Sequence, residues 1–216
     1  MKSKQFLSYI LPITKTITSQ YSGTLEITWH NGKKHLNSKN ANYSYGSLQN
    51  ILKFGIEQIA LQKVNSILVL GMGGGSVIET LRNDFNYTKS ITAVEIDPVI
   101  IEIAATEFGI SKNEHLKIHC LDALDFVKTD NEHYDVIIID LFIDLSVPNQ
   151  FLSESFWNHV LRLKSSKGDI IFNAAVNDSK SKTIQQLIGY LKTKIYKVNV
   201  FENVNNTNTL IILKSL

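Results

Sequence analysis

The chain has a single cysteine, Cys120, so it cannot form an internal disulfide, and this cysteine content fits a reducing compartment. It lacks any apolar run approaching the roughly 20 residues that a membrane-spanning helix requires. Neither sign of charge dominates, because 22 Lys and Arg stand against 20 Asp and Glu. These absences predict a soluble, cytoplasmic protein that makes no use of a membrane. A length of 216 residues allows one substantial core with a small appendage.

Charge is distributed unevenly, since residues 1–66 hold eight lysines against two glutamates. These lysines are scattered and no arginine lies among them, so we interpret them as a solvated surface and do not expect a nucleic-acid partner. His115, His119 and Cys120 raise the question of a metal. Positions four apart in a strand are about 13 Å apart, too far for one zinc ion, and we expect no metal.

The first residues, Lys2 and Lys4 followed by the mostly apolar stretch 6–13, lack the small-residue cleavage site of a signal peptide. We expect a first strand there. Alternating residues and the Asn31-Gly32 pair then predict a small antiparallel β-unit. Apolar positions at helical spacing predict a helix from Ser47 to about Gln62.

A glycine cluster between two apolar runs organises the rest of the chain. Residues 66–70 predict a buried strand, and the run 91–94 leads into Glu95. Glycines at such a turn permit positive φ angles and let a ligand approach the backbone, and the helix that follows points free N–H groups at that ligand. Glu95 can accept hydrogen bonds from both hydroxyls of a ribose. The stretch predicts a nucleoside site, and its glycines are Gly71, Gly73, Gly74 and Gly75.

Strands and helices then alternate. The continuous apolar run 134–140 is typical of a central parallel strand. Two final strands joined through asparagine-rich residues predict a closing hairpin with an antiparallel last strand. The expected strands are 66–70, 90–95, 116–120, 134–140, 169–173, 197–202 and 209–214, and the main expected helices end near residues 84, 108, 163 and 194.

We therefore predict a doubly wound α/β fold with a mostly parallel, seven-stranded Rossmann-like sheet and an antiparallel terminal hairpin strand. This domain is expected to span residues 44–216, after the small β-unit of residues 1–43. Ligands of such sheets bind beyond the carboxyl ends of the strands, at the point where strand order reverses. Four acids lie at the ends of these strands or at their margins: Glu95, Asp122, Asp140 and, just beyond, Asp144. Any one of them could instead cap a helix, as Asp122 could for the short helix after it.

Two ligand classes fit the glycine turn. A nicotinamide dinucleotide usually needs Gly-x-Gly-x-x-Gly for its pyrophosphate, and Ser76 occupies the last of these positions. A third strand that ends in Asp122-Ala123 can instead bind the amino group of adenine, and the terminal hairpin is typical of the S-adenosylmethionine fold. We favour a sulfonium nucleoside, either S-adenosylmethionine or its decarboxylated form.

The segments 69–76, 94–98, 122–123 and 134–140 together resemble the spermidine synthase (polyamine aminopropyltransferase) family of the class I methyltransferase fold. The resemblance implies that Glu95 holds the ribose and Asp122 the adenine. It implies Asp140 as the catalytic acid that accepts the proton or orients the attacking amine, with Tyr45 and Asp144 beside the substrate. The implied cofactor-binding residues are Gly71, Met72, Gly73, Gly74, Gly75, Glu95, Ile96, Asp97, Asp122 and Ala123.

Three positions depart from that family. Gly74 stands where the family usually has an aspartate that grips the amino group of the decarboxylated donor. Gly46 follows Tyr45 in place of a larger polar residue. Asp144 lies four residues after Asp140, whereas the second acid of the family comes three residues after the first.

Three functions follow, in this order. The first is aminopropyl transfer to a polyamine or related small amine, for which an acidic cavity suits a cation. The second is methyl transfer from intact S-adenosylmethionine. Gly74 supports it, because an aspartate there would repel the donor's carboxylate, although the segment after Asp140 lacks the prolines of many amino-methyltransferases. The third is a non-catalytic nucleoside-binding protein. A homodimer is possible, and we assign Phe142, Phe151 and Trp157 to the core.

Overall fold

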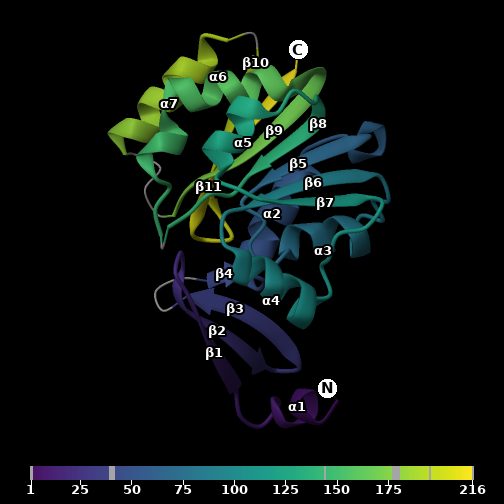
Figure 1. The fold of residues 1–216 in the computed structure, drawn as a ribbon. Coiled ribbons are helices and arrows are strands. Elements are labelled where there is room, and N and C mark those ends of the chain that lie inside the picture. The colour runs from purple at the N-terminus through teal and green to yellow at the C-terminus, as the bar shows by residue number, and fades with distance from the viewer. Residues whose placement is uncertain (1, 39–41, 144, 177–180, 195, 216) are drawn as a thin grey trace.

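The computed structural model describes residues 2–38, 42–143, 145–176, 181–194 and 196–215. It contains a seven-stranded sheet and a separate four-stranded sheet, which Figure 1 shows beneath the larger one. The large sheet has the order β10-β11-β9-β8-β5-β6-β7. Its strands are β5 (Ser66–Leu70), β6 (Ser90–Glu95), β7 (Leu116–Cys120), β8 (Tyr134–Ile139), β9 (Lys164–Val176), β10 (Tyr196–Val204) and β11 (Asn208–Ser215).

Five strands of the large sheet, β5 to β9, are parallel, whereas β11 runs antiparallel to both β9 and β10. In sequence order, β5 is the first strand of the large sheet. The chain adds β6 and β7 on one side of β5 and then β8 and β9 on its other side. Strand order therefore reverses at β5, between β6 and β8. The predicted doubly wound sheet with an antiparallel terminal strand is confirmed.

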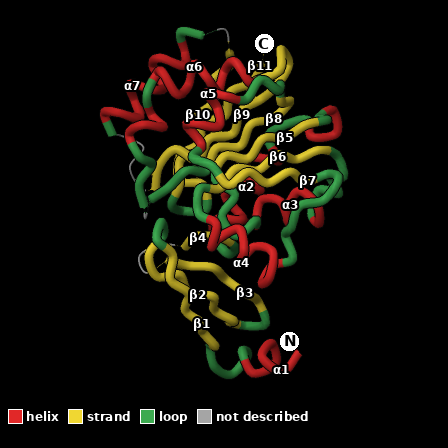
Figure 2. Tube along the Cα trace, in the orientation of Figure 1, coloured by secondary structure: helices red, strands yellow, loops and turns green. Residues whose placement is uncertain are grey.

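Helices cover both faces of this sheet, as Figures 1 and 2 show. One face carries α5 (Ala123–Thr129), α6 (Glu154–Leu163) and α7 (Lys182–Lys192), and the other carries α2 (Ser47–Glu57), α3 (Ser76–Asn83) and α4 (Pro98–Phe108). Because both faces are covered, the central strands are apolar throughout, and residues 136–139 are essentially inaccessible to solvent.

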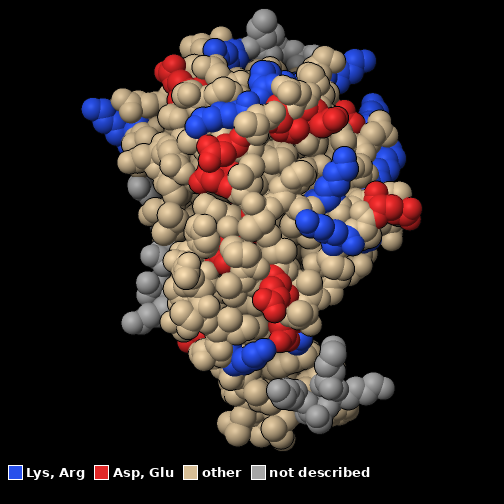
Figure 3. Space-filling view, in the orientation of Figure 1, with Lys and Arg blue, Asp and Glu red and all other residues tan. Residues whose placement is uncertain are grey.

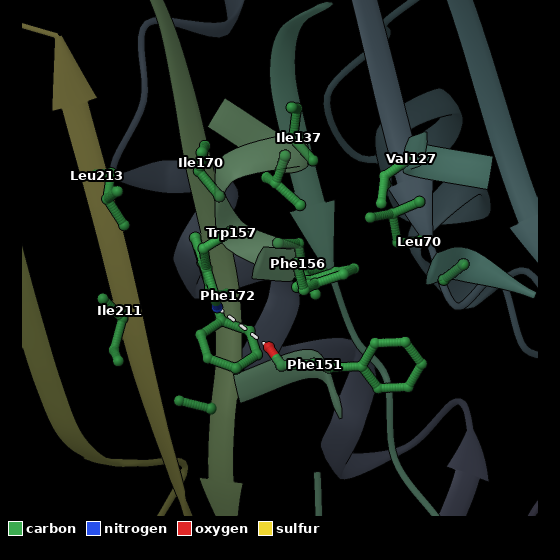
Figure 4. Packing of buried hydrophobic residues seen from close by; sticks show 14 of the residues in the cluster. Leu70, Val127, Ile137, Phe151, Phe156, Trp157, Ile170, Phe172, Ile211 and Leu213 are labelled. Carbon is green, nitrogen blue, oxygen red and sulfur yellow. Dashed lines mark hydrogen bonds between the residues drawn. The ribbon is translucent and has the colours of Figure 1, made fainter. Parts of the chain in front are cut away.

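The core on the α5–α6–α7 face contains Trp157, which is fully buried between α6 and the sheet. Its ring meets Phe172 edge to face at a centroid distance of 5.2 Å, and its indole N–H donates to the carbonyl oxygen of Phe151 at 3.1 Å (Figure 4). This bond satisfies the one polar group of a buried tryptophan. The assignment of Trp157 to the core is confirmed.

The N-terminal part forms an antiparallel four-stranded sheet from β1 (Ile13–Ser19), β2 (Gly23–His30), β3 (Lys33–Ser38) and β4 (Asn42–Ser44). It packs on α4, where Leu25, Ile27 and Leu36 meet Ile100 and Ile103 in a shared apolar cluster. Such a small sheet gains stability from resting on a helix. The predicted β-unit is present, and its separation from the rest at residue 43 stays a prediction.

The expected strand near the start is wrong. Residues Lys2–Leu7 form a helix, α1, and β1 begins only at Ile13. Ser8 links α1 to the turn between β2 and β3. Its hydroxyl donates to the carbonyl oxygen of Gln5 at 2.6 Å and accepts from the N–H of Gly32 at 3.0 Å. The segment is thus tied to the β2–β3 turn through side-chain bonds that an apolar pattern cannot predict.

The boundaries of most other elements follow the predicted ones closely. One exception is β9, which was predicted over 169–173 and spans Lys164–Val176, because its first residues already pair with the start of β8 at Tyr134. The strands at 66–70, 90–95 and 116–120 and the helix at 98–108 match to the residue. The helix predicted to run to Gln62 ends instead at Glu57, and Leu61–Lys63 form a separate 3₁₀ turn. A second 3₁₀ turn, Asn149–Leu152, precedes α6. No helix within the described ranges is both long enough and apolar enough to cross a lipid bilayer.

Candidate functional site

A cavity of about 330 Å³ lies beyond the carboxyl ends of β5, β6, β7 and β8, at the point where strand order reverses. This volume is within the range of sites for nucleoside-sized ligands. Its polar and glycine residues come from β4, the turn after β5, the start of α3, the ends of β6, β7 and β8, the 3₁₀ turn at 149–152, β9 and the β10–β11 turn. They are Ser44, Gly71, Gly73, Ser76, Glu95, Asp122, Asp140, Gln150, Asn173, Thr207 and Asn208.

The glycine turn brings β5, β6 and β8 together at one edge of the cavity. Gly71 has φ +85°, and a Cβ there would collide with the backbone carbonyl of Asp140, so only glycine allows the two strand ends to approach. The N–H groups of Gly71 and Met72 both donate to the carbonyl oxygen of Val94 at 3.0 Å, and that of Gly75 donates to Met72. These donors are used within the protein, so the turn is not a phosphate cradle. This disfavours a nicotinamide dinucleotide.

Glu95 ends β6 and lines the cavity while being 6 % exposed. One carboxylate oxygen accepts from the N–H of Gly73 at 2.9 Å and the other from the N–H of Asp97 at 3.1 Å. Burial raises the pKa of Glu95 to about 7, against the lowering effect of these two hydrogen bonds. Each carboxylate oxygen can accept a second hydrogen bond, so Glu95 is fixed in place and retains the capacity to bind hydroxyl groups.

The segment after β7 places Asp122 and Ala123 in the same cavity lining, with Ile96 from the end of β6. Asp122 is also the N-cap of α5, because its carboxylate accepts from the N–H of Leu124 at 2.6 Å. The capping interpretation and the ligand interpretation are therefore compatible. A capping carboxylate whose position is fixed by α5 still has an oxygen free to face the cavity.

Asp140 follows β8 and is held by side chains from two other strands. Its carboxylate accepts from the amide nitrogen of Asn173 on β9 at 2.9 Å. The amide oxygen of Asn173 accepts in turn from Asn208 on β11 at 2.9 Å, and Asn208 accepts from the hydroxyl of Thr207 at 2.7 Å. Burial raises the pKa of Asp140 to about 6, and the hydrogen bond from Asn173 opposes that rise.

This chain of amides was missing from the sequence prediction. Asn173 is 0 % exposed and Asn208 is 4 % exposed, yet both line the cavity. The register between β9 and β11 shifts between Thr209 and Leu210, beside Asn173, and a shift of this kind re-aims side chains. No local pattern pairs residue 173 with residue 208, although an asparagine in an otherwise apolar strand was a signal that could have been followed.

Four predicted site residues are not brought to the cavity lining. Asp97 is fully buried, caps α4 and accepts from the hydroxyls of Ser19 at 2.5 Å and Ser22 at 2.6 Å. Its carboxylate is therefore used to attach the small sheet. A Cβ on Gly75, which has φ +88°, would press on Ile110, so this glycine serves the turn and its packing.

Gly74 and Tyr45 also lie outside the lining. A Cβ on Gly74 would meet Ser44 at 3.1 Å and Leu36 at 3.2 Å, so this position faces the small sheet. Tyr45 is buried, stacks on Phe108 of α4 at a centroid distance of 4.3 Å, and donates to the carbonyl oxygen of Gly74 at 3.3 Å. Its phenol therefore braces the glycine turn from behind. Asp144 lies outside the described residues.

Phe142 and Phe151, which we assigned to the core, line the cavity as well. Phe151 is only 7 % exposed and packs edge to face with Phe156, so it belongs both to the core and to the cavity lining. Among the residues that the structure describes, the charged side chains of the lining are acidic: Glu95, Asp122 and Asp140.

Lysine and arginine lie elsewhere on the surface. In Figure 3 they are mixed with acidic groups towards the top and right of the view and do not form one continuous patch. Across the described ranges, no group of three or more His, Cys, Asp or Glu residues is arranged to hold a metal ion.

Comparison with known proteins yields two kinds of relative. The chain is 33 % identical over 132 residues to the eEF1A lysine and N-terminal methyltransferase of Bos taurus, which covers 56 % of this chain. It is 28 % identical over 161 residues to the polyamine aminopropyltransferase of Vibrio vulnificus, which covers 71 % of this chain. Both are transferases. The chain spans about a fifth (19 %) of the bovine protein and about half (52 %) of the Vibrio protein.

Solved structures give the same two kinds of relative, a methyltransferase and a spermidine synthase. Human methyltransferase-like protein 13 in complex with SAH superimposes with a TM-score of 0.63 at 26 % identity, covering 79 % of this chain and 80 % of the other. A probable spermidine synthase from Corynebacterium glutamicum superimposes with a TM-score of 0.65 at 17 % identity, covering 95 % and 77 %, which supports the fold. The sequence profile of the spermine/spermidine synthase domain matches residues 49–207, most of the chain. The chain therefore belongs to the spermine/spermidine synthase domain family.

Proposed function

We propose that this protein binds S-adenosylmethionine across the carboxyl ends of β5 to β8 and transfers its methyl group to an amine held at Asp140. A sulfonium is an electrophile whose leaving group is a neutral thioether, so the protein has mainly to hold an unprotonated nucleophile in line. The chain's own contribution is to bind the donor, orient the amine and accept or relay its proton.

The donor is assigned to the half of the cavity that β5, β6 and β7 build. Glu95 would accept hydrogen bonds from the ribose hydroxyls, since its carboxylate lines the cavity and is fixed by Gly73 and Asp97. Asp122 would accept from the adenine amino group, and Ile96 and Ala123 offer apolar surface to the ring. SAH, which the human relative's structure contains, is the kind of ligand that this arrangement suits.

One observation favours methyl over aminopropyl transfer, and it concerns the glycine turn. The direction in which a side chain at Gly74 would point is filled by Ser44 and Leu36. Beside the turn, the lining presents the hydroxyls of Ser44 and Ser76, which lie 3.0 Å apart. The lining acids of the described chain are Glu95, Asp122 and Asp140 alone. A donor tail that carries a carboxylate meets no acid at this turn, and that carboxylate balances the charge of the tail's own amine. A decarboxylated tail would have the amine alone, without an anionic partner.

Asp140 is assigned to the acceptor. A carboxylate with a pKa raised to about 6 is mostly ionised at neutral pH, so it can bind the amine and receive or relay the proton that the amine loses. One of its oxygens is held by Asn173, which leaves the other to face the amine. The chain from Thr207 through Asn208 and Asn173 would fix the orientation of the carboxylate, so these residues are positioning residues.

Aminopropyl transfer to a polyamine is the second candidate, and family membership and the Vibrio relative favour it. Both candidates use the same carboxylates, so a direct comparison is needed. The protein is incubated with S-adenosylmethionine or its decarboxylated form, together with spermidine, putrescine and lysine peptides, and product masses are recorded. Methyl addition to a peptide amine supports the proposal, whereas aminopropyl addition to putrescine overturns it. Donor binding without any product would favour a non-catalytic nucleoside-binding protein.

A further inference from the structure

Two serine side chains meet beside the glycine turn, and we call them the serine pair. Ser44 ends β4 and Ser76 begins α3, so the pair joins the small sheet to the large one. Both residues line the cavity, and they are 1 % and 3 % exposed. The hydroxyl of Ser44 donates to the oxygen of Ser76 at 3.0 Å and accepts from the N–H of Ser76 at 3.4 Å. Each serine therefore fixes the position of the other.

The serine pair retains one hydroxyl proton for a ligand. Each hydroxyl carries one proton, and the contact between the two oxygens uses only one of the two protons. With Ser44 as the donor in that contact, no described residue accepts the proton of the Ser76 hydroxyl. A buried hydroxyl that lines a cavity and keeps its proton is suited to an acceptor that the ligand brings with it.

The rest of the glycine turn offers few donors. Four N–H groups of residues 71–75 already donate to oxygens of the protein, namely those of Gly71, Met72, Gly73 and Gly75. The lining contains no lysine, arginine or histidine among the described residues.

The groups best placed to bind an anion here are the serine pair and the first turn of α3, whose free N–H groups carry partial positive charge. The acid of that first turn, Glu79, does not line the cavity, and it forms a hydrogen bond with Tyr45. The start of α3 therefore presents hydroxyl and N–H donors to the cavity, and its one carboxylate is used elsewhere.

We infer that the serine pair selects the donor: the hydroxyl of Ser76, held in place by Ser44, donates to the carboxylate in the tail of S-adenosylmethionine. This inference rests on the proposed function, which requires the intact donor. The decarboxylated donor has the same adenosine, sulfonium and amine but brings no acceptor to this position. A hydrogen bond to a carboxylate is stronger than one between neutral groups, so the pair favours the intact donor over the decarboxylated one.

The test uses three ligands that share the adenosine and differ in the tail. S-adenosylmethionine carries the carboxylate, its decarboxylated form lacks only that group, and 5′-methylthioadenosine has no tail. Calorimetry at pH 8 gives the Kd of each ligand for the wild type, for Ser76→Ala and for the double variant Ser44→Ala, Ser76→Ala. The double variant should bind S-adenosylmethionine at least tenfold more weakly, and Ser76→Ala should show most of this loss. The other two Kd values should change less than threefold, which also shows that the variants are folded.

The matched control is Thr80→Val, which removes a buried hydroxyl from the same helix. Thr80 is 1 % exposed, accepts from the amide of Gln49 at 3.0 Å, and lies outside the cavity lining. This variant should leave the ratio of the two sulfonium Kd values unchanged.

Two results would overturn the inference alone, in a protein whose wild type prefers the intact donor. One is an unaltered ratio of the two sulfonium Kd values in the double variant, and the other is an equal loss of affinity for all three ligands. A wild type that binds neither sulfonium, or that prefers the decarboxylated one, would overturn the proposed function together with the inference.

Discussion

The two halves of the cavity are built in different ways. In the β5–β6–β7 half, Glu95 and Asp122 are held by backbone N–H groups of residues near them in sequence or on the adjacent turn. In the β8–β9–β11 half, Asp140 is held by side chains 33 and, through one intermediate, 68 residues away. The first half is a property of strand–turn–helix segments, and the second exists only when the sheet is assembled.

This difference explains what the sequence could predict. The glycine turn, Glu95 and Asp122 were found because a strand, a turn and a helix follow each other at set spacing. Asn173 and Asn208 were not found, since their contact depends on the pairing of β9 with β11 and on the register shift beside Asn173. Long-range pairing of this kind leaves no local pattern.

The same dependence on tertiary contacts explains why two predicted site residues lie outside the cavity lining. Asp97 and Tyr45 follow the family's motifs, yet the first binds Ser19 and Ser22 and the second stacks on Phe108. In both cases the partner comes from an element far away in the sequence, and the N-terminal sheet or α4 supplies it. The fold was predictable from apolar periodicity, whereas the surroundings of single side chains depended on tertiary contacts.

The largest expected effect is on catalysis, from a substitution in the β8–β9–β11 half of the cavity, to which the acceptor is assigned. Asp140→Asn should lower kcat at least a thousandfold, because the group that takes the amine's proton is lost. The Kd for S-adenosylmethionine, measured by calorimetry, should change less than threefold, since Asp140 is assigned to the other half. The matched control Asp125→Asn, at an exposed carboxylate on α5, should alter neither. A fully active Asp140→Asn protein would remove Asp140 from its assigned role.

The next effect belongs to the donor half. Glu95→Gln should weaken binding of S-adenosylmethionine by 10- to 100-fold, because a charged acceptor of hydroxyl groups is replaced and one backbone N–H loses its partner. Once the donor is saturating, kcat should fall much less than in Asp140→Asn. Glu102→Gln, an exposed position on α4, serves as the control. An unchanged Kd for S-adenosylmethionine in Glu95→Gln would contradict the proposal that Glu95 binds the ribose hydroxyls.

Glu95 also gives the donor half a pH dependence. Its pKa is raised to about 7, so below that pH it is protonated and donates one hydrogen bond in place of accepting. Binding of the ribose hydroxyls favours the ionised form, and donor affinity should therefore rise several-fold between pH 6 and pH 8. Calorimetry across this range measures the change. The dependence should disappear in Glu95→Gln, and its persistence there would assign it to another group.

A further effect concerns the glycine turn. Gly74→Asp should weaken binding of S-adenosylmethionine about tenfold, because the new side chain must displace Ser44 or Leu36, which shifts the glycine turn, and adds a negative charge behind the turn that the donor's carboxylate approaches. Gly74→Asn, of nearly the same size, separates the steric part from the charge. Tighter binding of the decarboxylated donor by Gly74→Asp would show that the site accepts an aminopropyl donor readily.

The smallest effect tests the amide chain. Asn173→Asp keeps the shape but replaces the donor to Asp140 with an acceptor and places a second carboxylate beside it. Both changes raise the pKa of Asp140. The activity of the wild-type protein should fall as pH drops through about 6, where Asp140 becomes protonated, and in Asn173→Asp this limb should lie about one pH unit higher. An unshifted limb in a folded variant would reduce Asn173 to a structural residue.

The most direct test of the central claim is a pair of calorimetric titrations of the wild-type protein, one with S-adenosylmethionine and one with its decarboxylated form, at pH 8. The donor half described above should bind the intact donor at least tenfold more tightly. Tighter binding of the decarboxylated donor, or no binding of either, would contradict it.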